Sequence, residues 1–388
     1  MTTPARAAEE CPGSHAGAAR GDVGTRRDED ARREERASAD ERARAGADER
    51  ARAGADAPRS AAPPAPRALR SASAARRARR RALLHAALGA FGLVALIALI
   101  RHVGAAALLD TVSRAAPLLP LLVALEAARL GCELLATRAL CPPRSVPLAE
   151  LARIHVVAYP VASLMPAGRA TAEAVKAAML SPHVGAPRAA AIGTANQSLA
   201  LLSAAPLSLL AALSVGWTSG ASPLAAGLLV HVALSVASGL CVAFAARQRA
   251  AFAWITRRFA RAGHATAAFQ EAVRAHPPVP GRPFAAFCAG RALQAAQYAV
   301  LLAAVGAESG PLRALAAYGV GAIGTAAGDL IPAQIGATDG AFTLAAPLLG
   351  LTVSSAIAVS VLAHLLQAVG ALTGIAVTLA WRRAAPAP

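Results

Sequence analysis

The stretch LAELARIHVVAYPVASLMPAGRATAEAVKAAML (residues 148–180) decides how the rest of this 388-residue chain is interpreted. It opens with an apolar segment, about residues 148–164, that is short for a full membrane span, since a hydrocarbon core of ~30 Å needs about 20 helical residues. The break MPAG (residues 165–168) follows, and a more polar helix continues to about Leu180. Two short segments around a Pro–Gly break predict a re-entrant or elbow element.

A second broken element follows later in the chain. Its two short, glycine-interrupted segments, about residues 312–330 and 333–349, are separated by Ile331-Pro332. The two broken elements occupy corresponding places in the two halves of the apolar region. This pattern points to a repeat-built transporter with a site near the middle of the membrane.

Longer apolar segments surround these two elements. Full spans are expected at about residues 82–100, 115–135, 186–215, 223–246, 284–305 and 354–381. Hydrophobic residues make up 56% of the chain, although its first eighty residues contain few large ones, so the remainder is more apolar than this average. We therefore expect an all-α polytopic membrane protein with about six full transmembrane helices and two re-entrant or broken helix pairs, compatible with an inverted repeat.

Charge divides the chain further. Residues 1–80 predict a disordered cytoplasmic tail rich in Arg, Ala and Glu, because they carry too little apolar surface to offset the entropy of ordering; a wrongly assigned start codon is the alternative. Residues 81–383 form the helical membrane domain. The formal charge of +17 fits an anionic membrane surface better than nucleic acid, because arginines flank the apolar runs and only 4% of residues are aromatic.

The arginine-rich segments set the expected orientation. They should stay on the cytoplasmic side, which places both the N- and C-termini there. The basic stretch 247–283 is part of this pattern. It is either an amphipathic helix lying on the membrane surface or an ordinary positive-inside loop.

Polar residues after the first break define the first candidate site. Gly168 opens a half-helix on which Arg169, Glu173 and Lys176 recur at spacings of four and three, on one face. A helix N-terminus attracts anions, and Arg and Lys add donors suited to phosphate, while Glu173 would pair with them. Two interpretations remain open: a lipid-headgroup site, or a solvated interfacial helix with ordinary i,i+4 pairs.

The second break carries the carboxylates Asp329 and Asp339 beside Gly336. Such acids at membrane depth bind a cation or proton, or pair with a buried arginine. The alternative is that Thr338 or Asp339 caps the following helix. His364 in the last span is a ligand or proton carrier, or else it hydrogen-bonds a neighbouring helix.

Three charged residues also lie within the predicted span 115–135. Glu126, Arg129 and Glu133 share one helical face. They face the bundle interior or water, or they form an intrahelical ion-pair ladder near the cytoplasmic end of the span.

Other motifs carry no chemistry. GVGAIG (residues 319–324) matches GxGxxG, but no strand precedes it, so close helix packing through small residues explains it, as it does for Gly370 and Gly374. The five cysteines form no CxxC pair and the nine histidines no HExxH motif. We therefore expect no metal site, no cofactor and, without a recognisable catalytic arrangement, no enzymatic activity.

The two breaks resemble a known family. Pro166-x-Gly168, followed by Glu173-Ala-Val-Lys176 and Met179-Leu180, is similar to the "P-G…G-E-x-x-R…L" element of the lysylphosphatidylglycerol synthase transmembrane, or flippase-like, family. The sequence QIGATDGA (residues 334–341) resembles that family's "G-G-x-G-x-x-[DE]-G" element. The resemblance covers roughly residues 80–383. It departs from the family pattern at Asn196-Gln197, at His364 and at Lys176, where members commonly carry other charged residues.

The resemblance implies an all-helical domain with re-entrant segments in a bacterial inner membrane, and a role in moving or handling polar lipids between leaflets. We expect no synthase activity, because we expect the chain to lack the family's aminoacyl-transferase domain. The resulting hypothesis is a lipid flippase for anionic or polar lipids, with membrane phospholipids or other polar lipids as partners and no nucleic acid. The alternative is a non-transporting accessory or scaffold subunit for envelope lipid or glycan biosynthesis. A second copy of the chain or an envelope-biosynthesis protein would be its protein partner.

Overall fold

The computed structural model describes Arg101, Ala106, Asp110, residues 113–250, Ala253 and residues 263–384. The predicted tail (residues 1–80), the first predicted span (residues 82–100) and the middle of the basic stretch lie outside the described residues. All of the regular structure in the described part of the chain is helical.

The helices follow one another with short connections. In chain order they are η1 (Ala116–Leu118), α4 (Leu119–Leu140), α5 (Leu148–Leu164), α6 (Gly168–Val184), α7 (Ala186–Leu202), α8 (Ala204–Ser219), α9 (Pro223–Ala245), α11 (Gly263–Arg274), α12 (Gly281–Ala304), α13 (Pro311–Ala327), η3 (Pro332–Gln334), α14 (Ala337–Ala345) and α15 (Val353–Ala384).

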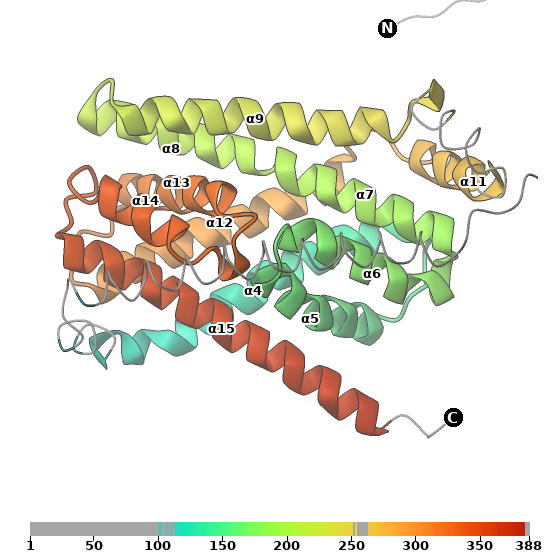
Figure 1. Cartoon of the computed structure of the whole chain (residues 1–388), viewed down its shortest axis with the longest axis horizontal. Helices are drawn as coiled ribbons and strands as arrows, with labels where there is room; N and C mark the ends of the chain where they lie inside the picture. Colours follow the sequence, from blue (N-terminus) through green and yellow to red (C-terminus); the bar gives the residue numbers. More distant parts are fainter. Residues whose placement is uncertain are drawn as a thin grey trace, which may run out of the picture. The chain divides into compact units, whose positions relative to one another are not determined.

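Long helices run along the bundle (Figure 1). The segments Ala186–Ser219, Pro223–Ala245 and Val353–Trp381 are long and apolar enough to cross a membrane. Helices α4 and α12, with 22 and 24 residues, pack side by side and reach about 33–36 Å at 1.5 Å per residue. The expected number of six spans stays a prediction, because the first of them is not described.

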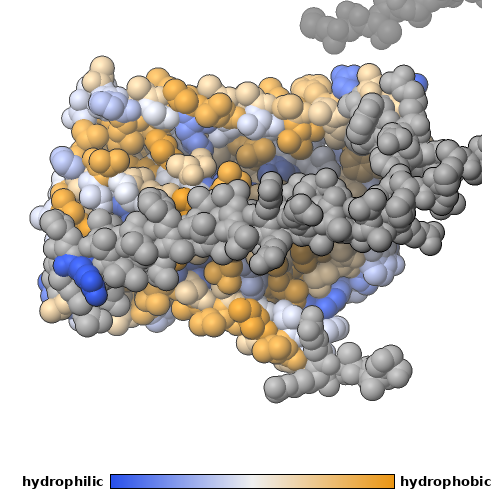
Figure 2. Space-filling model, viewed as in Figure 1, coloured by the Kyte–Doolittle hydropathy of each residue, from blue (hydrophilic) through white to orange (hydrophobic). Residues whose placement is uncertain are grey.

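The outer surface of the bundle is apolar. Leu213, Trp217, Leu234 and Leu372 expose between 60% and 86% of their surface, and broad hydrophobic areas follow the upper and lower edges of the face in Figure 2. An exposed belt of this kind suits contact with lipid and not with water.

Both predicted breaks are present, and each separates two helices packed as a hairpin. At the base of the α5–α6 hairpin, His183 Nε2 lies 3.7 Å from Glu150 Oε1. At the base of the α13–α14 hairpin, the Ser214 hydroxyl at the far end of α8 donates to the Leu312 carbonyl at 2.7 Å. The two hairpins therefore enter the bundle from opposite ends, each along about half its length (Figure 1). An inverted repeat is compatible with this arrangement and stays a prediction.

The tips of the two hairpins meet inside the bundle. The Ala167 amide donates to the Asp329 carbonyl at 2.7 Å, which joins the first break directly to the second. Both tips hold non-glycine residues at positive φ, with Ala167 at 48° and Ala333 at 55°. This left-handed backbone is sparsely populated for residues with a side chain, so surrounding contacts hold the tips in place.

The second hairpin differs from its prediction in one respect. The helix expected over residues 333–349 begins at Ala337 and ends at Ala345. The reason is local, because Ala333, Gln334 and Gly336 all take positive φ values and cannot continue a helix.

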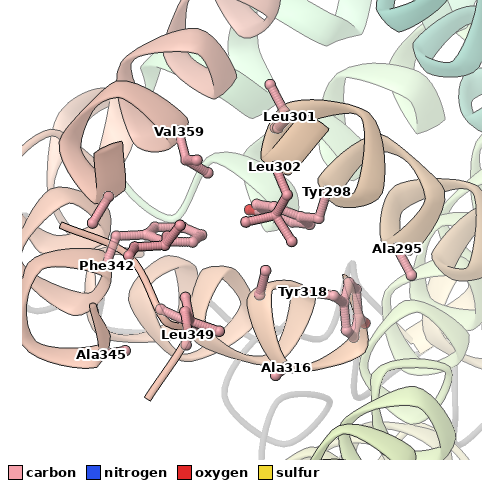
Figure 3. Close-up of a cluster of buried hydrophobic side chains, with 14 of the residues drawn as sticks. Ala295, Tyr298, Leu301, Leu302, Ala316, Tyr318, Phe342, Ala345, Leu349 and Val359 are labelled. Atoms are coloured by element: carbon pink, nitrogen blue, oxygen red, sulfur yellow. The ribbon is translucent and has the colours of Figure 1, made fainter. Parts of the chain in front are cut away.

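Aromatic side chains fill the core beside the second hairpin (Figure 3). The Tyr298 ring of α12 lies 6.5 Å from that of Tyr318 on α13 and 5.7 Å from that of Phe342 on α14. Leu302 and Leu349 close the same cluster. Burial of these rings fixes α13 and α14 against the long helix α12.

The GxGxxG stretch packs helices together, as predicted. A Cβ atom at Gly321 would overlap the Tyr298 hydroxyl, one at Gly319 would approach Leu228 Cδ2 to 2.7 Å, and one at Gly324 would approach Thr338 Cα to 2.8 Å. Gly370 has the same function, since a Cβ there would lie 2.6 Å from Tyr159 Cε1.

The described part of the basic stretch is packed and not free. Helix α11 lies against α7, the Arg247 guanidinium donates to the His276 carbonyl at 2.7 Å, and Arg274 donates to the Arg247 carbonyl at 2.8 Å. Whether this region also rests on a membrane surface stays a prediction.

Candidate functional site

An ion-pair ladder runs along α4, as its sequence spacing predicts. Arg129 donates to Glu126 through Nε (2.9 Å) and Nη2 (2.6 Å), and through Nη1 to Glu133 (2.7 Å). The three side chains expose between 12% and 17% of their surface. A charged ladder this deeply buried must be held by more than its own helix.

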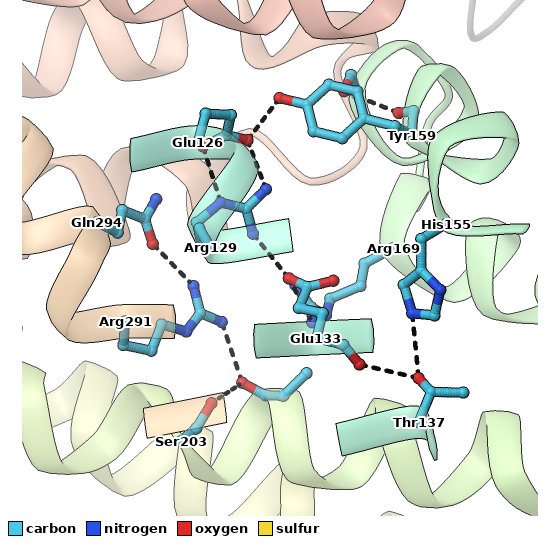
Figure 4. Close-up of polar contacts among 12 residues, drawn as sticks. Glu126, Arg129, Glu133, Thr137, His155, Tyr159, Arg169, Ser203, Arg291 and Gln294 are labelled. Atoms are coloured by element: carbon cyan, nitrogen blue, oxygen red, sulfur yellow. Dashed lines mark hydrogen bonds and ion pairs between the residues drawn. The ribbon is translucent and has the colours of Figure 1, made fainter. Parts of the chain in front are cut away.

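Neighbouring helices supply that support, and Figure 4 shows the contact that Tyr159 makes with Glu126. The Tyr159 hydroxyl of α5 donates to Glu126 Oε1 at 2.8 Å, and the Gln297 amide of α12 donates to Glu126 Oε2 at 2.9 Å. Because Glu126 accepts hydrogen bonds from side chains of three helices, the ladder joins helices inside the bundle and is not confined to one end of the span.

Arg169 reaches from the first break into this interior. Its Nη2 lies 3.5 Å from Glu133 Oε1, and its guanidinium lies 5.8 Å from the centre of the Phe287 ring. Its Nε is buried without a hydrogen-bond partner. Glu133 therefore forms ion pairs with two guanidinium groups, those of Arg129 and Arg169, while the buried Nε–H group of Arg169 has no acceptor.

Glu173 and Lys176 form a separate pair. Lys176 Nζ lies 2.6 Å from Glu173 Oε1, and the two residues are only 6% and 4% exposed. The Asn196 amide donates to Glu173 Oε2 at 3.2 Å and to the Thr137 hydroxyl at 2.9 Å, and Thr137 also contacts His155 Nε2 at 3.1 Å. Burial argues against a solvated interfacial helix here, and the lysine is already neutralised.

Arg291 on α12 is a member of the site that the sequence reasoning missed. It donates to the Ala200 carbonyl at 3.0 Å and to Gln294 Oε1 at 3.2 Å, and among the described residues no carboxylate forms an ion pair with it. Its electrostatic neighbours include Glu133, Arg129 and Arg169. A single arginine within the predicted span 284–305 was the available signal, since charges at membrane depth mark interior sites.

We call Glu126, Arg129, Glu133, Arg169 and Arg291 the central cluster. Within the cluster three guanidinium groups face two carboxylates, and the charge of Arg169 also acts on the Asp329 carboxylate; Arg291 is the guanidinium with which no described carboxylate forms an ion pair. Arg169 belongs to the first turn of α6, and the free N–H groups of a helix N-terminus favour anions. Guanidinium groups match the geometry of phosphate oxygens, so an anionic phosphate group is the ligand that this arrangement suits.

The second break is organised around Asp339, which is fully buried. Its carboxylate accepts from the Gly336 amide at 2.7 Å and from the Ser360 hydroxyl at 2.5 Å, and it lies 3.3 Å from His364 Nε2. The capping interpretation is thus confirmed for Asp339 and not for Thr338, whose hydroxyl is buried without a partner. His364 hydrogen-bonds a neighbouring helix, as predicted.

Asp329 belongs with the first break and not with Asp339. Its backbone carbonyl accepts from Ala167, and the charge of Arg169 acts on its carboxylate. The structure therefore gathers the candidate residues in two groups, Arg169 with Asp329 at the hairpin tips, and Asp339 with Gly336 at the start of α14. In the part of the chain that is described, no group of His, Cys, Asp and Glu side chains is suited to holding a metal ion.

A helical bundle with a lipid-facing exterior, two broken hairpins and a charged interior defines an integral membrane protein of the polytopic helical class. Its family follows from a match over residues 83–374: the chain belongs to the family described as lysylphosphatidylglycerol synthase TM region. The resemblance drawn from the two breaks is thereby confirmed, and the chain is a membrane protein related to lipid metabolism. Comparison with curated proteins and with solved structures gave no match.

Proposed function

We propose that this chain is a lipid translocase that moves anionic or other polar lipids between the leaflets of the membrane. The observation that carries the proposal is Arg291, whose guanidinium forms no ion pair with a described carboxylate, in a charged cluster that reaches the meeting tips of two opposed hairpins. A lipid phosphate would satisfy Arg291 and the unused Nε of Arg169. Binding it would offset the cost of keeping an unbalanced guanidinium group at membrane depth.

The hairpins offer a means of alternating access. The α5–α6 hairpin closes the bundle from one end and the α13–α14 hairpin from the other, and the hydrogen bond between Ala167 and Asp329 joins their tips. In repeat-built transporters, movement of one half against the other exposes a fixed central site to each side in turn. Small displacements of either hairpin would expose the central cluster in this way.

The proposed orientation follows from the arginines. Arg144, Arg188, Arg247 and Arg282 lie at the bundle end that contains the base of the α5–α6 hairpin. Arg153 lies at the same end and stacks 4.2 Å from the Trp381 ring, which brings the end of α15 there. Positive charge favours the cytoplasmic side, so both termini would be cytoplasmic in a bacterial inner membrane.

An accessory role without transport is the second candidate. It is favoured by the complete pairing of Glu173 with Lys176 and by the enclosure of Asp339 by Ser360 and His364. Such pairs stabilise a fixed bundle and leave these charges unavailable to a lipid. In that role the chain would scaffold enzymes of envelope lipid or glycan synthesis.

The two roles are separated by reconstitution into liposomes with fluorescent phosphatidylglycerol, followed by chemical quenching of the outer leaflet. We expect the wild-type chain to accelerate exchange, and Arg291→Gln and Arg169→Ala to slow it at least about tenfold, as expected for the loss of a charge-assisted contact. Arg282→Gln is the matched control, because this arginine lies on the same helix but is exposed.

Lys176→Ala tests separately whether Lys176 itself binds the lipid headgroup, as the sequence predicts. If Lys176 only neutralises Glu173, this variant should unfold at a lower temperature than the wild type, while the fraction that remains folded should still transport lipid. Wild-type protein that moves no anionic lipid would refute the translocase proposal and leave the accessory role.

A further inference from the structure

A cavity lies at the arginine-rich end of the bundle, apart from the central cluster. Its volume is about 390 Å³, within the range of about 300–1,000 Å³ typical of small-molecule sites. The end of α4, the first turns of α7, the end of α9 and the segment from α11 to α12 enclose it. None of the five residues of the central cluster lines it.

The cavity wall is amphipathic. Leu140, Ile192 and Val273 contribute to its apolar part, and Arg188, Arg247 and His276 contribute the basic groups. Among the described residues that line the cavity there is no carboxylate. An apolar wall suits a hydrocarbon chain, and the unbalanced cations suit an acidic group at its end.

Arg247 has donor capacity that the protein does not use. Its Nη2 donates to the His276 carbonyl at 2.7 Å, while its Nε is buried without a hydrogen-bond partner. Burial lowers the pKa of this guanidinium, and the charge of Arg274 lowers it further. A buried N–H group without an acceptor is costly, so an acidic ligand oxygen placed there would be bound favourably.

We propose that this cavity binds a single-chain anionic amphiphile, with its alkyl chain against α4, α7 and α9 and its acidic group on Arg247 and Arg188. A free fatty carboxylate and an alkyl phosphate share this chemistry. The site is independent of the proposed translocation, because it uses none of the residues of the central cluster.

The test uses the full-length protein in nanodiscs of phosphatidylcholine and photoreactive twelve-carbon probes with a carboxylate, a phosphate or a trimethylammonium head. Peptide mass spectrometry locates the attached probe. We expect at least one of the two anionic probes to label the cavity-lining parts of α7 or α9, and the cationic probe to leave them unlabelled. The anionic head that labels more strongly identifies the source of the ligand.

Three variants make the result specific. Arg247→Gln should reduce labelling about tenfold, while Arg249→Gln, an exposed arginine outside the cavity wall, should leave it unchanged. Ala195→Phe fills the cavity and should abolish labelling. Arg291→Gln should label as the wild type does, whether or not it still translocates lipid.

The proposal is overturned by equal labelling of the Arg247 and Arg249 variants, which would indicate general surface attraction. It is also overturned if the cationic probe labels the same peptides, or if neither anionic probe does. Because Ala195→Phe could fail to fold, thermal unfolding is measured for each variant, and Arg247→Gln alone decides the outcome if the α7 variant is unstable.

Discussion

Replacing Glu126 by glutamine tests whether water is excluded from the central cluster and whether its charges are as closely paired as the structure indicates. In the wild type, Glu126 accepts two hydrogen bonds from Arg129 and one each from Tyr159 and Gln297. The substitution keeps the shape of the side chain but removes its charge. Glu133 would then be the one carboxylate left among the three guanidinium groups of the cluster.

The expected loss follows from the cost of breaking a buried ion pair, about 3–5 kcal/mol. At an unfolding entropy of about 2.1 cal/mol/K per residue, 1 kcal/mol corresponds to roughly 1.2 °C in the unfolding temperature of a chain of this size, so Tm should fall by at least about 4 °C. The measurement is thermal unfolding of purified protein in detergent, followed by circular dichroism and by the fluorescence of a thiol-reactive dye.

Glu308→Gln is the matched control for Glu126→Gln. Glu308 pairs with Arg313 at 2.9 Å, but its side chain is 71% exposed, so its loss should cost at most about 1 kcal/mol. Adding Arg129→Leu to Glu126→Gln removes the guanidinium left in excess and should recover part of the loss. Equal Tm shifts for the two glutamine variants would refute the reasoning, because they would mean that water reaches the central cluster.

Three further predictions concern other parts of the bundle. Gly168→Ala should lower Tm by several degrees, because its Cβ would overlap the α5 backbone. Gly340→Ala meets open space, so the gain in helix propensity should stabilise the fold by about 0.5–1 kcal/mol and raise Tm slightly. Asp339→Ala should cost about 2–4 kcal/mol in thermal unfolding, because the cap and both side-chain contacts are lost; an unchanged Tm would contradict this. Burial raises the pKa of the Cys141 thiol to about 11, so the rate of its alkylation by maleimide should increase with pH up to that value. At pH 8 Cys141 should react roughly 100-fold more slowly than the exposed cysteine of a Gln248→Cys variant, and equal rates would show that the Cys141 site is open to water.

Much of the architecture could be read from the order of residues. At residues 165–168 and 331–336 proline and glycine occur close together and the helices end there, because proline lacks an N–H group and glycine favours conformations outside the helix. The two breaks, and the family to which their motifs belong, were therefore accessible from sequence. The small-residue packing at residues 319–324 was accessible for the same reason, since it depends on the absence of a side chain.

The division of the candidate site was not accessible. Spacing placed Arg169, Glu173 and Lys176 on one helical face, yet the structure directs Arg169 to α4 and closes the other two into a pair. Helical periodicity states which residues share a face, but not which neighbour that face meets. The identity of each partner depends on the rotation and crossing of whole helices.

The sequence by itself determined where the chain breaks, which segments are apolar, and that Glu126, Arg129 and Glu133 share one helical face, because these properties act within one or two helical turns. Only the tertiary structure decided that Gln297 reaches Glu126 across 171 positions, that Arg169 reaches Glu133 across 36, and that the Ala167 amide meets the Asp329 carbonyl. These contacts arise from the packing of complete helices against one another, and no local rule of charge or periodicity extends that far along a chain.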